Sequence, residues 1–207
     1  MKIIIFGATG SVGQKVVEHA LQQGHHITAF TRDSKKLALS HPNLQTCIGD
    51  VLDLSAVHDA VRDHDAVICT LGAGRHGGIR ANGTHNIIHA MEALGIRRLI
   101  CQTSLGVGES RNNLDLFWKY IMFGMVLRAA YADHVEQEEL VRKSKLDWII
   151  VRPGAFTDGG HTGQYQHGFS ENHTSTQLKI SRHDVADFIL KQLSDNHYLH
   201  QAPALSY

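Results

Sequence analysis

Three glycines near the start of the chain have the spacing needed to hold a phosphate group. Residues 3–6 form an unbroken apolar run, Gly7, Gly10 and Gly13 follow it directly, and a helical pattern begins at once. This strand, Gly-x-x-Gly-x-x-Gly turn and helix favour binding of a dinucleotide pyrophosphate, although a purely structural turn is the alternative. The unpaired N–H groups and positive dipole end of the helix would face the anion. The predicted contacts in this turn are Gly7, Thr9, Gly10, Ser11, Val12 and Gly13.

The end of the second predicted strand indicates which dinucleotide is bound. A site that prefers NAD places Asp or Glu there, about 20 residues after the glycines, to hold the ribose 2′-hydroxyl. Here Arg32 occupies the sensitive position, followed by Asp33, with Lys35 and Lys36 close behind. A guanidinium is planar, always charged and suited to bidentate contact with a phosphate. The sequence therefore favours NADP(H), with Arg32 and Lys35 or Lys36 as contacts, while Asp33 leaves a ribose contact open.

Small and acidic residues end the next two predicted strands. Asp50 follows the third strand, where its carboxylate could hold an adenine amino group or simply stabilise a turn. Residues 71–74, Leu-Gly-Ala-Gly, follow the fourth strand, where small residues allow a cofactor to pass close to the backbone. The cofactor contacts predicted beyond the glycine turn and Arg32 are Asp50, Val51, Leu71, Gly72, Ala73, Ser104 and Pro153.

Strand-like and helix-like segments alternate through the first three quarters of the chain. Strands are predicted at residues 2–6, 26–31, 45–48, 66–71, 98–103 and 148–152, and helices at 13–22, 54–62, 82–94, 133–143 and 181–193. Several strands are apolar on both faces, as expected where helices cover both sides of a parallel sheet. The prediction is an α/β fold with a Rossmann-like, doubly wound parallel sheet, formed by residues 1–207 as a single domain.

Composition argues against several classes of function. Lys plus Arg and Asp plus Glu each number 20, so no net field attracts nucleic acid or an anionic membrane. No apolar run approaches the roughly 20 residues that span a bilayer, and no secretion signal precedes the first strand. Cys47, Cys69 and Cys101 are widely spaced within predicted strands, so we expect buried free thiols in a reducing compartment. A cytoplasmic protein is expected.

Two stretches depart from the alternation of strands and helices. Residues 114–127 are rich in Phe, Trp, Tyr and Met, and residues 154–177 are rich in Gly, His, Thr and Gln and are predicted as loop. Ligands of doubly wound sheets bind beyond the carboxyl ends of the strands, where both stretches lie. Approximately residues 105–130 and 154–180 are therefore expected to form the substrate side. For residues 114–127 an ordinary core helix is the equal alternative.

Taken together, these residues resemble the atypical short-chain dehydrogenase/reductase superfamily, which includes NmrA-like proteins. Within it the chain looks most like the NADPH-dependent flavin reductases, also known as biliverdin-IXβ reductases. The glycine turn, residues 31–34 and residues 49–51 match the whole superfamily. The matches that point to the flavin and biliverdin branch are Ser104, Asp133 followed by His134, and Thr162-Gly163-x-Tyr165.

Two departures from that branch lie on the substrate side. Members carry a histidine shortly after the sixth strand, where this chain has Ala155. The segment between Ser104 and His134 is also longer here, because it includes the aromatic residues 114–127. The resemblance therefore supports the cofactor more firmly than the substrate.

The tyrosines decide which reduction the site can support. Carbonyl reduction in the wider superfamily uses Tyr-x-x-x-Lys, and no tyrosine of this chain has a lysine four positions later. Without a phenol of adjusted pKa, delivery of a proton to an alkoxide is poorly supported. Reduction of a flavin needs no such acid, because the charge spreads over a conjugated ring and water can supply the proton. The protein must then mainly place two flat molecules in a partly apolar slot.

Several side chains are candidates for the reacting end of the site. Ser104, at the end of the fifth strand, is the best candidate for a hydrogen bond near the nicotinamide or the acceptor, with a strand-end cap as alternative. His134 falls where many atypical members place a lysine, and could contact the cofactor or cap its helix. The residues predicted to contact the substrate are Ala155, Phe156, Trp118 and His134; Phe117 is a further aromatic candidate, and core packing is the alternative for any one aromatic residue. His85 and His89 are four apart on a helix, but no third ligand is evident, so no metal is expected.

The sequence thus predicts an NADPH-dependent reductase of free flavins, with flavin as substrate rather than prosthetic group, and with bilins or quinones as further planar acceptors. The alternative is a non-catalytic NADP(H)-binding regulator of the NmrA-like kind that contacts a partner, with residues 114–127 as the candidate contact surface. An exposed apolar surface on these residues would favour the regulator, and a cleft lined by them the enzyme. The oligomeric state is left open.

Overall fold

An eight-stranded sheet forms the centre of the computed structural model, which describes residues 1–170, 173 and 175–207. The strands lie in the order β3-β2-β1-β4-β5-β6-β10-β8, and every pairing is parallel except that of β10 with β8. The predicted doubly wound parallel sheet is confirmed. The strands are β1 Lys2–Phe6, β2 His26–Thr31, β3 Leu44–Ile48, β4 Ala66–Cys69, β5 Arg98–Gln102, β6 Asp147–Pro153, β8 Gln166–His167 and β10 Ala204–Ser206.

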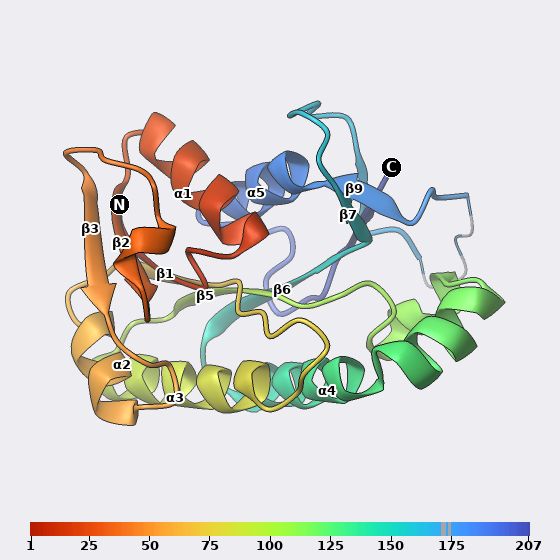
Figure 1. Ribbon diagram of the computed structural model, residues 1–207, viewed down its shortest axis with the longest axis horizontal. Helices are drawn as coiled ribbons and strands as arrows, with labels where there is room; N and C mark the ends of the chain where they lie inside the picture. Colours follow the sequence, from red (N-terminus) through yellow and green to blue (C-terminus); the bar gives the residue numbers. More distant parts are fainter. Residues whose placement is uncertain (171–172, 174) are drawn as a thin grey trace.

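Helices cover both faces of this sheet (Figure 1). Helices α1 (Ser11–Gln22) and α5 (Arg182–Lys191) pack together on one face, while α2 (Leu54–Val61), α3 (Ile79–Leu94) and α4 (Arg128–Lys143) lie on the other. Strand β1 shows why: Ile3 and Ile5 join the apolar cluster under α1 and α5, while Ile4 and Phe6 join the opposite cluster. Successive side chains of a strand point to opposite faces, so a strand buried on both must be apolar throughout.

The helices α3 and α4 begin earlier than predicted, at residues 79 and 128 instead of 82 and 133. The N-terminus of α3 is capped by a residue distant in sequence, because the buried Asp133 carboxylate accepts hydrogen bonds from the backbone N–H of Arg80 and Ala81. Such a tertiary cap satisfies N–H groups that a local Ser or Asp usually serves. Strand β4 is shorter than predicted and ends at Cys69. The other predicted boundaries agree to within two residues, and Ser181 caps α5 as expected.

The two stretches that depart from the alternation also differ from expectation. Residues 117–126 form a π-helix, η3 (Phe117–Val126), in which only Phe123 is buried, so the alternative of an ordinary core helix is contradicted. The predicted loop at 154–177 includes β7 (Ala155–Thr157), which pairs with β9 (Lys179–Ser181), and also β8. These strands are too short to show a pattern and depend on distant partners. Residues 171, 172 and 174 of that predicted loop lie outside the described residues. Short 3₁₀ helices complete the fold as η1 (Ser34–Lys36) and η2 (Gly108–Asn113).

The cysteines lie in strands, as predicted, and are free. Cys69 and Cys101 are buried neighbours on β4 and β5, whereas Cys47 on the outer strand β3 is only half-buried. The prediction of a buried thiol is therefore wrong for Cys47, because β3 is the edge strand of the sheet.

Asp184 of α5 forms hydrogen bonds with the loop around Thr162 and with the C-terminal residue Tyr207. The buried Asp184 carboxylate accepts hydrogen bonds from the N–H of Thr162 and of Gly163, at 2.8 and 2.9 Å, and from the hydroxyls of Thr162 and Tyr207. Burial alone would raise the pKa of Asp184, but the hydrogen bonds from Tyr207, Gly163 and Thr162 outweigh it and lower the pKa to about 2.

Replacing Asp184 with Asn is expected to make the free energy of unfolding depend less on pH in acid. The folded pKa lies below the unfolded value of about 3.9, so the contribution of this carboxylate is complete above about pH 4 and disappears as the pH falls toward 2. Urea unfolding at pH 7 and pH 3 measures it: the stability difference between the native protein and Asp184→Asn should shrink at pH 3. A difference that stays constant would contradict the assignment.

Candidate functional site

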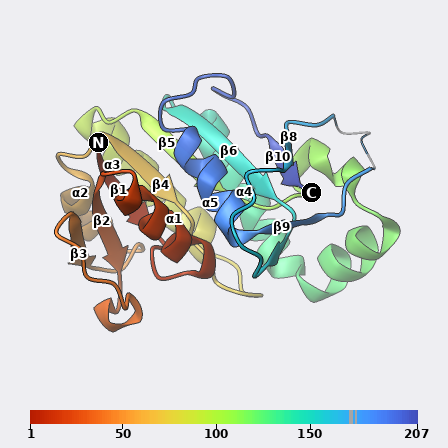
Figure 2. The ribbon, with the colours of Figure 1, turned by 90° about the horizontal axis from the view of Figure 1, so that it is seen from above.

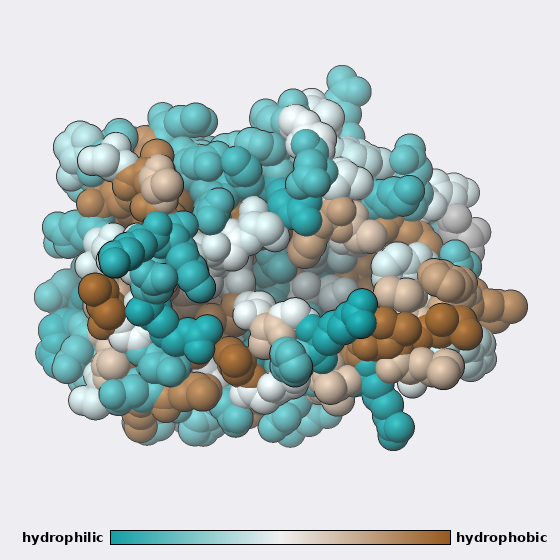
Figure 3. All heavy atoms as spheres, viewed as in Figure 1, coloured by the Kyte–Doolittle hydropathy of each residue, from teal (hydrophilic) through white to brown (hydrophobic). Residues whose placement is uncertain are grey.

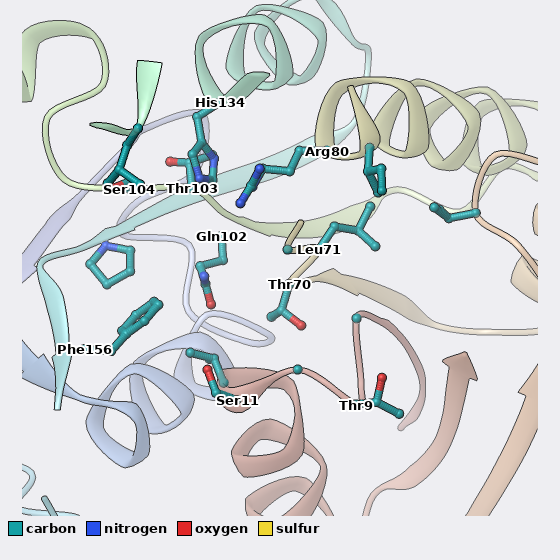
Figure 4. Close-up of a pocket in the computed structure, with 18 of the residues that line it drawn as sticks. Thr9, Ser11, Thr70, Leu71, Arg80, Gln102, Thr103, Ser104, His134 and Phe156 are labelled. Atoms are coloured by element: carbon teal, nitrogen blue, oxygen red, sulfur yellow. The ribbon is translucent and has the colours of Figure 1, made fainter. Parts of the chain in front are cut away.

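A cleft of about 520 Å³ lies at the carboxyl ends of the central strands. Gly7 after β1 and Thr70 after β4 both line it, and the strand order reverses between these two strands. This reversal is the switch point at which open α/β sheets bind their ligands. Figure 4 shows Thr9 and Ser11 on one side of the cleft, with Arg80, Thr103, Ser104 and His134 on the other.

The glycine turn is built as the sequence predicted. Helix α1 begins without a side-chain cap and without an acidic residue in its first turn, so its first N–H groups are available to an anion. Gly7 has φ +85°, and a β-carbon there would lie 2.4 Å from the carbonyl oxygen of Thr70. Gly13 does not line the cleft; it lies behind the turn, where helix and strand pack closely. The predicted contacts Gly7, Thr9, Gly10, Ser11 and Val12 all line the cleft.

Basic side chains lie at the end of the cleft beyond β2. Arg32 and Lys36 line it, whereas Lys35, the predicted contact, does not. Asp33 also lines it, but its carboxylate accepts a hydrogen bond from the N–H of Lys35 at 3.0 Å and caps η1. The acidic side chain is thus engaged with the backbone while the guanidinium beside it faces the cleft.

The adjoining wall follows β3 and β4. Asp50 lines the cleft and also stabilises its own turn, since its carboxylate accepts from the N–H of Leu52 at 3.0 Å. Both roles considered for Asp50 are therefore compatible. Val51, Leu71 and Gly72 line the cleft as well, but Ala73 lies outside it.

The opposite end of the cleft is more apolar and contains the predicted substrate-side residues. Ser104 and Pro153 line it, and the Ser104 hydroxyl donates to the carbonyl of Leu105 at 3.2 Å. Trp118 of η3 contacts Phe123, with ring centroids 5.9 Å apart, so it belongs both to the wall and to an aromatic cluster. Phe117 is exposed and does not line the cleft. The predicted substrate contacts Ala155, Phe156, Trp118 and His134 all line this end.

His134 is held neutral at the wall of the cleft. Burial, followed by the positive charge of Arg80, lowers the pKa of His134 to about 4 against the opposing hydrogen bond with Gln137. Its Nδ1 lies 3.2 Å from the Gln137 amide oxygen, while the Gln137 amide nitrogen donates to Thr84. Nδ1 therefore carries the proton, and Nε2 is left as a hydrogen-bond acceptor for a hydroxyl in the cleft.

The neutral state of His134 predicts a pH dependence of stability. The unfolded imidazole, with a pKa of about 6.5, takes up a proton before the folded one does, so stability falls as the pH drops from 6.5 toward 4. A His134→Gln variant lacks this linkage. We expect its stability relative to the native protein to improve between pH 7 and pH 5, by a few kcal/mol at most. Urea unfolding measures the change, and identical pH profiles would contradict the buried neutral imidazole.

Five polar residues that line the cleft were not among the predicted contacts: Thr31, Thr70, Arg80, Gln102 and Thr103. Thr70, Gln102 and Thr103 could have been found, because they sit at the carboxyl ends of β4 and β5. Arg80 gave no such signal. It is buried and paired with Asp133 at 3.2 Å, and this pairing depends on the early start of α3.

Two of these residues carry buried polar atoms without a hydrogen-bond partner among the described residues. Arg80 Nε and the side-chain oxygen of Gln102 are buried without a hydrogen bond among the described residues, and both side chains line the cleft. A buried polar group without a partner costs about 1–3 kcal/mol, so such atoms mark a place where a bound molecule or water completes the bonding. Together with the uncapped start of α1, they fit a polar ligand such as a dinucleotide.

A buried network of charges lies behind the apolar end of the cleft. The Thr103 hydroxyl donates to the Glu138 carboxylate at 2.7 Å, and the buried Arg152 donates to the same carboxylate at 2.9 Å. Arg152 also pairs with Glu109 at 3.2 Å. These contacts join α4, β6 and the end of β5, so they fix the backbone that presents Ser104.

The parallel sheet, the glycine turn and the cleft at the switch point define a Rossmann-type NAD(P)H-binding protein. The chain belongs to the NAD(P)H-binding family, whose model matches residues 7–196, and the resemblance to the atypical short-chain dehydrogenase/reductase class is confirmed.

Relatives and solved structures extend over almost the whole chain. A UPF0659 protein of Saccharomyces cerevisiae is 29% identical over 93% of this chain and 87% of its own length. The structure of ChuY, described as an anaerobilin reductase of Escherichia coli O157:H7, is 28% identical with a TM-score of 0.83, covering 100% of this chain and 97% of that chain. A short-chain dehydrogenase/reductase of Veillonella parvula in complex with NADP is 18% identical, with a TM-score of 0.85 over 100% and 94% of the chains. The Veillonella parvula structure shows that this chain has the same fold.

Two other kinds of site concern metal ions and membranes. No three His, Cys, Asp or Glu side chains within the described residues gather closely enough to hold a metal ion. In the same part of the chain, no helix is both long and apolar enough to cross a bilayer.

Proposed function

We propose that this protein is an NADPH-dependent reductase that transfers hydride to a free flavin, with bilins and quinones as further planar acceptors. The observation that carries the proposal is a single continuous cleft with two unlike ends. One end has the glycine turn and Arg32, which suit a dinucleotide with a 2′-phosphate, and the other has Trp118 and Phe156, which suit a flat ring.

The side chains of the cleft favour a conjugated acceptor over a carbonyl. No tyrosine lines the cleft within the described residues, and His134 is neutral with its free nitrogen accepting, so neither provides a general acid. A bound nicotinamide supplies a hydride, and a flavin takes up that hydride together with one proton from water. The protein then binds, orients and shields the two rings, with the Ser104 hydroxyl beside them; its proton is donated to the Leu105 carbonyl, so its oxygen offers a hydrogen-bond acceptor.

The direct test is steady-state NADPH oxidation with FMN, FAD and riboflavin as acceptors, and with NADH as the control donor. We expect a rate that saturates with flavin and is higher with NADPH. Bilins and quinones follow as acceptors in the same assay. Tight NADPH binding with no turnover of any acceptor would overturn the proposal.

Replacing Arg32 with Ala tests the choice of cofactor. Loss of a charged hydrogen bond to the 2′-phosphate typically costs about 1.5–3 kcal/mol, so the Kd for NADPH should rise by about 10- to 150-fold. The Kd for NADH should change by less than about threefold. Fluorescence titration with each nucleotide measures both. Lys35→Ala is the matched control, because Lys35 lies outside the cleft, and Lys36→Ala should show an intermediate loss. Equal losses for both nucleotides would remove the 2′-phosphate assignment.

A regulator that binds NADP(H) without turnover is the second candidate. The observation that favours it is the exposed outer face of η3, where Leu116 and Met125 are each 72% exposed. The inner face of the same helix lines the cleft through Trp118 and Phe123, which favours the enzyme. The turnover assay separates the two candidates.

A further inference from the structure

The helix η3 carries a cluster of apolar side chains on the outer surface of the protein. We call it the η3 face: Leu116, Phe117, Tyr120, Ile121, Met125 and Val126. Figures 1 and 2 show η3 at one end of the molecule, beyond the sheet, and the brown surface at the same end of Figure 3 marks its apolar side chains. Phe117 is 56% exposed. A contiguous group of this kind marks an interaction site.

The charges around the η3 face are mostly positive. Residues 110–132 contain three basic side chains, Arg111, Lys119 and Arg128, against one acidic side chain, Asp115. Among the described residues, neither Lys119 nor Arg128 forms a salt bridge. The surface thus combines aromatic and aliphatic groups with cations whose charge is available to a partner.

We propose that the η3 face docks onto an anionic lipid bilayer. A short helix with exposed Leu, Ile, Met and aromatic side chains and neighbouring cations lies in the interface plane of a membrane, where Tyr and Lys reach the headgroups. The local positive charge complements anionic headgroups, although the net charge of the whole chain is zero. The proposal differs from the sequence-based expectation of no membrane partner, which rested on the net charge of the whole chain and not on how the charges are distributed.

A second copy of the chain fits this surface less well. A two-fold contact would bring the same patch of both subunits together, and so place Lys119 and Arg128 near their counterparts with only Asp115 to offset them. An anionic surface meets no such repulsion.

The docking surface also has a consequence for the substrate, and this step rests on the proposed function. The inner side of η3, with Trp118 and Phe123, and the flanking Leu114 and Leu127 form the wall of the cleft. An apolar planar acceptor dissolved in the bilayer, such as a quinone, would therefore leave the membrane next to the cleft entrance. The reduction would consume one NADPH and one proton from water per quinone and yield the hydroquinone and NADP⁺.

Vesicle co-sedimentation with the full-length protein tests the docking. The probe is phosphatidylcholine vesicles containing about one-third phosphatidylglycerol, compared with phosphatidylcholine alone. We expect binding to the anionic vesicles that largely disappears at about 1 M NaCl, where the Debye length is about 3 Å. The variant Lys119→Glu with Arg128→Glu should weaken binding by more than about tenfold, since each cation near such a surface contributes roughly fivefold.

Apolar substitutions provide the second variant and its control. Leu116→Ser, Ile121→Ser and Met125→Ser together remove exposed groups that do not line the cleft, and should reduce binding to either vesicle. Ile48→Ser is the matched control, because Ile48 is 69% exposed on the distant edge strand β3. Turnover of water-soluble FMN should be unchanged in the serine variant.

The outcomes keep the two proposals separate. Light scattering that shows a dimer, dissociated by the serine variant, together with no vesicle binding, would overturn the bilayer in favour of a second copy. Binding that is indifferent to both sets of substitutions would overturn the assignment of the η3 face. FMN turnover without vesicle binding would leave the reductase intact and reject the docking. Vesicle binding without turnover of any acceptor would support the docking and reject the reductase.

Discussion

A Gly13→Ala variant is expected to unfold with a free energy lower by about 3 kcal/mol, because the added methyl group meets backbone that has no room to move. A β-carbon at this position would lie 2.1 Å from the carbonyl oxygen of Gly7 and 2.8 Å from its carbonyl carbon. Relief requires α1 to move away from β1, which also displaces the helix N-terminus at the proposed phosphate site. We therefore expect weaker NADPH binding as well as a Tm lower by about 10 °C for a chain of this length.

Gly160→Ala is the matched control for this change. A β-carbon at Gly160 meets no atom within 4 Å, and the residue does not have a positive φ. Its stability should stay within about 0.5 kcal/mol of the native protein or rise slightly, because Ala restricts the unfolded chain. Thermal unfolding and NADPH titration of both variants test the prediction. Equal Tm values for Gly13→Ala and Gly160→Ala would show that the close approach of helix and strand is not required.

Replacing Arg152 with Met is expected to cost about 3–5 kcal/mol, because the buried Glu138 carboxylate loses its closest charged partner and keeps only Arg142, which is 3.7 Å away and partly exposed. Arg152 is 1% exposed, and its guanidinium makes two contacts with Glu138, which is itself 3% exposed. Methionine fills much of the space but cannot balance the charge. Since Thr103 is bonded to the same carboxylate, we also expect its position in the cleft to change and flavin turnover to fall.

Two further variants separate charge from packing in this network. Arg152→Met combined with Glu138→Leu removes both charges, and should be more stable than Arg152→Met alone, because no buried carboxylate remains unpaired. Arg97→Ala breaks the exposed pair with Asp147, at 2.8 Å, and should change stability far less than Arg152→Met does, because solvent screens an exposed pair. Urea unfolding measures all three variants. A double variant less stable than Arg152→Met would show that packing, and not charge, dominates at this position.

The glycine turn shows how much of the cofactor end could be predicted from the sequence. Residues 3–13 contain both the apolar strand and the glycine spacing, and the structure places Gly7, Thr9 and Gly10 on the cleft as expected. Arg32 could be predicted for the same reason, since it directly follows the last residue of β2. In each case the informative residues are close together in sequence, so the local pattern alone determines where they lie relative to the strand that precedes them.

The acceptor end needed the tertiary structure. Arg80 reaches the cleft because Asp133, 53 residues away, caps α3 and binds the guanidinium. The tautomer of His134 depends on Gln137 and through it on Thr84 of another helix. The two faces of η3 could not be told apart from composition, because both are apolar and only packing against α4 and against Leu105 and Leu114 decides which one is covered. Sequence by itself determined the sheet, the glycine turn and the basic residue that follows β2 and lines the cleft. Contacts between distant segments decided the substrate side, since burial and hydrogen-bond partners there exist only once the chain has folded.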